Sequence, residues 1–108
     1  MSFDVTITPD CLRQVKRLAK KHASLKDDLK SLVADLAERP TQGTPLGKNL
    51  FKIRLAIRSK GQGRSGGARV ITYVIVTAKH VYVAALYDKS ERATLTDKEL
   101  LKLAEGLR

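Results

Sequence analysis

The chain has 108 residues, a length that fits one domain and that can bury a hydrophobic core without a metal or a disulfide. Its 43% hydrophobic and 30% charged residues exclude a disordered chain. No apolar run approaches the ~20 residues that span a bilayer, and the start of the sequence carries no secretory signal pattern. The single cysteine, Cys11, can form neither an internal disulfide nor a cysteine zinc site by itself. We therefore expect one cytoplasmic domain over residues 1–108, with a formal charge of +10 and no membrane partner.

The first 38 residues predict a strand followed by two helices. Residues 3–7 alternate apolar and polar side chains, as a half-buried strand does. Thr8 and Pro9 are typical of a helix start, and apolar residues then recur at spacings of three and four. Ser24, with Asp27 three residues later, predicts the start of a second helix, which Pro40 ends. The glycines and prolines of residues 43–47 indicate a connecting loop.

The second half of the chain changes its hydrophobic period from helix to strand. Residues 51–58 alternate, and the β-branched runs at 70–76 and 81–86 predict a hairpin. Between them, residues 59–67 contain four glycines and indicate a loop. A capping-box pattern at 96–99 predicts a short final helix. The order β-α-α-β-β-β-α predicts an α+β domain, in which the N-terminal strand and helical hairpin pack on one face of an antiparallel sheet.

The positive charge is concentrated in one-fifth of the chain. Residues 48–69 contain seven basic residues and no acidic one: Lys48, Lys52, Arg54, Arg58, Lys60, Arg64 and Arg69. A single-sign patch of this kind is typical of a protein that binds a polyanion, because each neutralised phosphate releases counterions. The alternative is a solvated basic loop that has no partner.

Strand alternation and antiparallel pairing predict that part of this charge gathers at one end of the sheet. Lys52, Arg54 and Arg58 alternate with core residues and so project from the exposed face. A meander of three strands then places Arg69 near Arg58, and places Tyr87 and Lys89 near Arg69. The glycine-rich loop, with its own two cations, is expected over the same end. We expect one basic cluster that contains a phenol and no acid.

Neither histidine is expected to serve this cluster. His80 lies at the opposite turn of the meander, and His22 continues the apolar stripe of the first helix, as a packing residue would. No nucleophile–histidine–acid arrangement can be assembled, and residues 61–67 lack the ending of a phosphate-binding P-loop. The chemistry that lysine, arginine and tyrosine support best is the binding or cleavage of a phosphodiester. We expect neither a metal nor a cofactor.

Three segments resemble a known family. Residues 51–55 (Phe-Lys-Ile-Arg-Leu), 64–73 (Arg-Ser-Gly-Gly-Ala-Arg-Val-Ile-Thr-Tyr) and 87–91 (Tyr-Asp-Lys-Ser-Glu) are similar to segments of the RelE/ParE toxin superfamily. The Ser-Gly-Gly-x-Arg and Tyr-x-Lys-x-Glu patterns are most similar to the HigB-type members. The resemblance extends over nearly the whole chain and implies a RelE-like fold.

The resemblance also implies an activity and a set of roles. Such toxins pair with a cognate antitoxin, here a helix-turn-helix protein of the HigA type, and when free they enter the ribosomal A site and cut mRNA without a metal. Lys52 and Arg54 match the Lys-x-Lys strand of these enzymes, and Arg69 matches the arginine that stabilises the scissile phosphate. Lys89 stands in place of a further cation. The remaining basic residues are expected to grip the RNA backbone: Lys48, Arg58, Lys60 and Arg64.

The proton-transfer group stays open, and so do two other functions. Leu95 stands where RelE has a tyrosine, which leaves Tyr87 or Lys89 as the group that moves protons. A ParE-like inhibitor of gyrase would share the fold but would not need phosphate-directed cations on the sheet. A non-catalytic RNA-binding module would need more stacking platforms than the five aromatic residues of this chain provide.

Overall fold

The protein, described here by a computed structural model over residues 2–61, 63 and 66–107, is built on one five-stranded sheet with the order β1-β5-β4-β3-β2. The strands are β1 (Asp4–Ile7), β2 (Thr44–Gly47), β3 (Leu50–Leu55), β4 (Ala68–Ile75) and β5 (His80–Asp88). Strands β3, β4 and β5 form the expected antiparallel meander at the centre.

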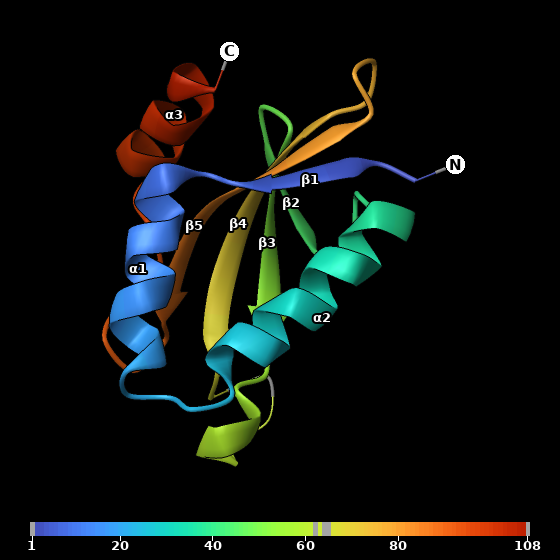
Figure 1. The fold of residues 1–108 in the computed structure, drawn as a ribbon. Coiled ribbons are helices and arrows are strands. Elements are labelled where there is room, and N and C mark those ends of the chain that lie inside the picture. Colours follow the sequence, from blue (N-terminus) through green and yellow to red (C-terminus); the bar gives the residue numbers. More distant parts are fainter. Residues whose placement is uncertain (1, 62, 64–65, 108) are drawn as a thin grey trace.

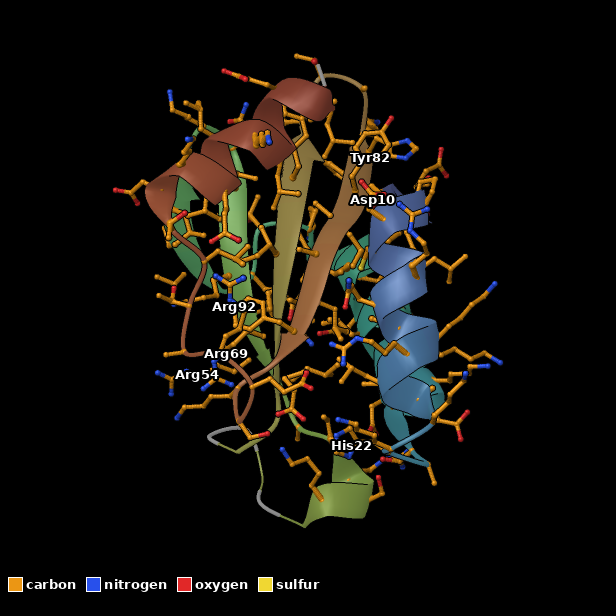
Figure 2. All side chains as sticks on the ribbon, turned by 90° about the vertical axis from the view of Figure 1, so that its left-hand side faces the viewer. Asp10, His22, Arg54, Arg69, Tyr82 and Arg92 are labelled. Carbon is orange, nitrogen blue, oxygen red and sulfur yellow. The ribbon has the colours of Figure 1, made fainter. Side chains whose placement is uncertain are left out.

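Helices cover both faces of the sheet. Helices α1 (Pro9–Ala19) and α2 (Leu25–Glu38) lie side by side over one face, and helix α3 (Asp97–Gly106) lies across the other face (Figure 1, Figure 2). A 3-10 turn, η1 (Arg58–Lys60), follows β3 at the end of the sheet where β4 begins. The sheet is therefore the middle of three layers wherever α3 extends.

Local sequence explains where the helices begin. The Thr8 hydroxyl accepts a hydrogen bond from the Cys11 amide at 3.3 Å, and Pro9 occupies the first turn, where no backbone donor is needed. Thr96 and Glu99 form the predicted capping box at the start of α3. Ser24 does occupy the N-cap position of α2, but its hydroxyl makes no capping bond and instead donates to Asp28 at 2.7 Å.

The predicted α+β class and order of elements are confirmed, with four differences in detail. The segment expected as a loop at 43–47 contains strand β2, which pairs with β3 around a bulge. Strand β1 joins the sheet parallel to β5, so the sheet is mixed rather than antiparallel. Strand β3 ends at Leu55 rather than at residue 58. Helix α3 packs on the second face, which the sequence analysis expects to be exposed.

Two hydrophobic clusters follow from this layering. The larger lies between the sheet and helices α1 and α2, and includes Leu18, Leu25 and Leu36, each fully buried. The smaller lies beneath α3 and includes Ile71, Tyr73 and Tyr87. The second cluster buries apolar side chains on the same face of the sheet that carries the cations. The cations are therefore confined to one end of that face. Among the residues that the structure describes, none of the helices has the length and hydrophobicity to cross a membrane.

Candidate functional site

One row of side chains crosses the three central strands at the end of the sheet. Arg54 of β3 pairs with Arg69 of β4, and Arg69 pairs with Tyr87 of β5. Directly paired residues of antiparallel strands point to the same face, with their Cβ atoms roughly 5 Å apart. The predicted convergence of Arg54, Arg69 and Tyr87 is therefore confirmed, although the three residues span 33 positions of the chain.

Two further cations extend this row. Lys52 lies two residues before Arg54 on the same face of β3 and is half-buried. The Arg92 guanidinium lies over the Tyr87 ring, with its Cζ atom 5.8 Å from the ring centre. Figure 2 shows Arg54, Arg69 and Arg92 together on the side of the sheet opposite α1. We call these five residues the site row: Lys52, Arg54, Arg69, Tyr87 and Arg92.

The centre of the site row is shielded from water. Arg69 is 5% exposed and Tyr87 is 6% exposed, and the Arg69 Nη1 donates to the Ala68 carbonyl at 3.2 Å. The buried Tyr87 hydroxyl has no hydrogen-bond partner within the described part of the chain. A buried polar group without a partner is costly, so this hydroxyl is an unsatisfied group at the centre of the site row.

Arg92 is the site residue that the sequence analysis missed. Its guanidinium binds both oxygens of Glu99, at 2.7 and 3.0 Å, and also donates to the Thr94 carbonyl. The hydrogen bond from Arg92 is the main reason why the pKa of Glu99 falls to about 2. The expectation of a cluster without acids is thus wrong, because α3 brings Glu99 to its edge. The sequence feature that could have indicated this role is the position of Arg92, which directly follows the Tyr-x-Lys-x-Glu pattern of residues 87–91.

Lys89 lies just beyond the site row. Its backbone amide donates to the Gly67 carbonyl at 3.2 Å, which holds it next to the start of β4. Its side chain is exposed, in contrast to the buried Tyr87. The sequence analysis predicts Lys89 near Arg69, and the structure places the Lys89 backbone beside Gly67, two residues before Arg69.

Arg58 does not join the site row. It lies past the end of β3, where its Nε donates to Asp28 Oδ1 at 2.6 Å and its backbone amide donates to Asp28 Oδ2 at 3.1 Å. The predicted position of Arg58 beside Arg69 is wrong because β3 ends early and the partner of Arg69 is Arg54. The buried carboxylate of Asp28 draws Arg58 towards α2 instead.

Lys60 is also turned towards the helices. Its Nζ donates to Asp88 Oδ1 at 3.0 Å, and its side chain is only 13% exposed. Asp88 is the neighbour of Tyr87 but points to the opposite face of β5, because successive side chains of a strand alternate. A lysine that is buried against a carboxylate is not available to an RNA backbone.

The other two predicted RNA contacts are not brought to the site row. Lys48 occupies the turn between β2 and β3 with a φ of 54°, before β3 begins at Leu50, whereas Arg54 lies near the other end of β3. Arg64 lies outside the residues that the structure describes. The predicted RNA contact of Arg64 is therefore not included in the site.

The two histidines lie away from the site row. His80 begins β5, where its ring stacks on Tyr82 and bonds to the Thr6 hydroxyl at 2.8 Å. His22 follows α1 and its Nε2 lies 2.9 Å from Asp88 Oδ2, on the helix side of the sheet (Figure 2). Within the described residues, no three His, Cys, Asp or Glu side chains gather as metal ligands would.

A close contact with the backbone of β3 explains why residue 67, which precedes β4, is a glycine. A Cβ atom on Gly67 would lie 2.0 Å from the Leu55 carbonyl oxygen, so no other residue fits this close approach of two strands. The close approach lies next to the Leu55–Ala68 pair, and the following pair along the two strands is Arg54 with Arg69. The glycine of the Ser-Gly-Gly-x-Arg pattern therefore helps to build the site row.

Comparisons with known proteins identify a family model that matches this chain and solved structures that are similar to it. Residues 11–106 match the family model described as the RelE toxin of the RelE/RelB toxin–antitoxin system. The fold is similar to that of a doubly arginine-substituted E. coli toxin RelE in the free state, with a TM-score of 0.66 and 19% identity over 99% of this chain and 98% of that one. It is also similar to isolated E. coli RelE, with a TM-score of 0.62 and 19% identity over 94% and 97%. The toxin–antitoxin complex RelBE2 of Mycobacterium tuberculosis contains a chain with a TM-score of 0.59 and 17% identity over 87% and 95%.

Proposed function

The chain belongs to the RelE toxin family, and on that premise we propose that it is an endoribonuclease that cuts mRNA on the ribosome and so stops translation. The observation that carries this proposal is the site row, in which Arg54, Arg69 and Tyr87 meet in register. It supplies cations for a phosphate together with a polar group for proton transfer. Action on the ribosome would require the protein to be in the cytoplasm, which is the localisation we propose.

The cations of the site row would bind and polarise the scissile phosphate. Arg69 is the strongest candidate because its guanidinium is nearly buried, and a charge in a water-poor site stabilises an anion more than an exposed charge does. Arg54 and Lys52 would hold the neighbouring backbone from β3. Cleavage then needs the 2′-hydroxyl to lose its proton and attack phosphorus, while the 5′-oxygen leaves with a proton.

Of the two candidates for proton transfer, Tyr87 is favoured over Lys89. The Tyr87 hydroxyl is buried on the site row without a partner among the described residues, whereas the Lys89 side chain is exposed past the end of β5. A proton-transfer group must come within hydrogen-bond reach of the reacting oxygen. Tyr87 is the direct strand partner of Arg69, so a phosphate bound to Arg69 would lie close to the Tyr87 side chain, and the buried hydroxyl would have to become accessible to reach the reacting oxygen.

The proposal is tested with purified wild type and Arg69→Ala in a reconstituted translation system. We expect mRNA cleavage at the ribosomal A site by the wild type and a loss of about 100-fold or more in the variant, because Arg69 supplies charge to the transition state. Arg39→Ala is the matched control, since Arg39 is exposed on the remote end of α2 and pairs with Asp35. Intact message in all samples, together with inhibited supercoiling by gyrase, would support the ParE-like alternative instead.

An antitoxin is the partner that family membership implies, and we propose that it is a helix-turn-helix protein with an acidic amphipathic segment. A groove of about 330 Å³ runs between α1 and α2 and continues towards the turn that joins them. Its floor is apolar, and no acidic residue is found among its described lining residues. Four lysines form its rim: Lys16, Lys20, Lys26 and Lys30. This charge and this apolar floor complement an acidic amphipathic helix.

The groove is tested with Lys26→Glu/Lys30→Glu and the antitoxin that is encoded next to the toxin gene. We expect antitoxin affinity to fall about tenfold or more, because two rim charges on one face of α2 change sign. Cleavage without antitoxin should not change, since both residues lie on the helix side of the sheet. Lys98→Glu on α3 is the control, and equal losses of affinity in both variants would contradict this location.

A further inference from the structure

Behind the site row, the carboxylate of Asp88 holds a buried network. The Asp88 side chain is 4% exposed. Its Oδ1 accepts hydrogen bonds from Lys60 Nζ at 3.0 Å, from the Ser90 amide at 2.9 Å and from the Ser90 hydroxyl at 2.8 Å. Its Oδ2 lies 2.9 Å from His22 Nε2.

The network joins three segments that are distant in the sequence. His22 comes from the turn between α1 and α2, Lys60 comes from η1, and Ser90 comes from the turn after β5. The Asp88 backbone carbonyl also accepts from the amides of Glu91 and Arg92, at 3.0 and 3.1 Å. One residue therefore fixes both the end of β5 and the turn that leads to Arg92.

The position of Asp88 in the strand connects this network to the site row. Asp88 pairs with Ala68, and the adjacent pair along the two strands is Arg69 with Tyr87. Because side chains alternate, Asp88 points to the helix face while Tyr87 points to the site row. A shift of the β5 end would therefore move Tyr87 and Arg92 relative to Arg69.

We propose that Asp88 is a positioning residue, which through Lys60, His22 and Ser90 locks the end of β5 so that Tyr87 and Arg92 face Arg69. The inference rests on the proposed cleavage activity. A buried carboxylate that receives bonds from all of these donors is satisfied in one arrangement only, since any displacement leaves buried charge uncompensated. Four hydrogen-bond donors therefore converge on this one side chain.

The protonation state of Asp88 is consistent with this role. Burial alone would raise the pKa of Asp88, but the hydrogen bonds from Ser90, Lys60 and His22 outweigh burial and hold the pKa well below its ordinary value. The carboxylate is therefore charged throughout the physiological range and keeps its donors.

The test uses Asp88→Asn, which preserves the side-chain shape but replaces one acceptor oxygen by an NH2 group. We expect the single-turnover cleavage rate at saturating ribosomes to fall about 10- to 100-fold, and the ribosome concentration for half-maximal rate to change less than about threefold. Asp35→Asn is the matched control, because Asp35 binds Arg39 and Gln42 on the remote end of α2. A purely structural role would lower the melting temperature but leave the rate per folded molecule unchanged, and that result would overturn the proposal.

Two further measurements keep the inference separate from the proposed function. Ser90→Ala removes only the bond from the exposed serine hydroxyl, and we expect it to lower the rate about two- to fivefold without affecting folding. Amide hydrogen exchange at Lys89, whose N–H donates to Gly67, should accelerate about tenfold or more in Asp88→Asn. If the wild type does not cleave mRNA, the proposed function fails, and the exchange still decides the inference: unchanged exchange at Lys89 would overturn it.

Discussion

The two faces of the sheet at the end of β3, β4 and β5 use the same stretch of basic sequence in opposite ways. On one face, Lys52, Arg54 and Arg69 form the site row with Tyr87. On the other face, Arg58 and Lys60 are bound to the buried carboxylates of Asp28 and Asp88. The concentration of positive charge over residues 48–69 therefore does not describe a single surface.

The difference comes from the acids that the helices and β5 bring to each face. A buried carboxylate needs a cation and hydrogen-bond donors, so Asp28 and Asp88 neutralise the basic residues on the helix side. On the site side, the carboxylate against Arg92 is Glu99, and its side chain is 41% exposed. The site row therefore keeps a net positive charge that a phosphate can use.

The largest effect that separates the two faces is expected from Tyr87→Phe. The hydroxyl has no partner among the described residues, so its removal should leave the melting temperature unchanged or slightly raised. If it transfers protons, the cleavage rate should fall by about 100-fold or more. Single-turnover cleavage and thermal unfolding of the same samples measure both effects. Full activity in Tyr87→Phe would move the proton-transfer role to Lys89.

The opposite pattern is expected from Asp28→Asn on the helix face. This change should lower the free energy of unfolding at pH 7 by about 1–3 kcal/mol, since Asp28 is buried while the Arg58 side chain is 67% exposed. The cleavage rate per folded molecule should be unaffected. Denaturant unfolding at several pH values measures the loss.

The pH dependence of this loss follows from the pKa of Asp28. Burial by itself would raise that pKa, but hydrogen bonds from Ser24 and Arg58 outweigh it and lower the pKa below the ordinary value of 3.8. A group whose folded pKa is depressed stabilises the protein above its unfolded pKa and loses this contribution as the pH falls through the folded value. The difference between wild type and Asp28→Asn should therefore be largest near neutral pH and shrink below about pH 4. A difference that grows in acid would contradict this assignment.

The sequence predicts most of the fold because its local signals agree. Hydrophobic periods, the caps at Thr8 and Thr96, and the two β-branched runs indicate the helices and the meander that the structure contains. Strand β2 was missed because its four residues carry a proline and a glycine, which indicate a turn. The parallel pairing of β1 depends on tertiary contacts with β5, which no local pattern reports.

For the site, the register of the strands could be predicted from the sequence, but the ion pairs between basic and acidic side chains could not. Antiparallel geometry alone brings Arg69 to Tyr87, although a bulge between Ile71 and Thr72 shifts the pairing further along β5. The directions of Arg58 and Lys60 depend on Asp28 and Asp88, each at least 28 residues away in the sequence. Arg92 was missed for a related reason, since its place over Tyr87 depends on where α3 packs.

The most direct test of the account compares the cleavage rates of Arg54→Ala and Arg58→Ala under single-turnover conditions on the ribosome. Both variants remove one arginine from the same basic segment, four residues apart. We expect Arg54→Ala to lose about 100-fold in rate and Arg58→Ala to stay within about threefold of the wild type, because only Arg54 lies on the site row. Equal losses in the two variants, or a larger loss for Arg58→Ala, would contradict the division of the charge between the two faces.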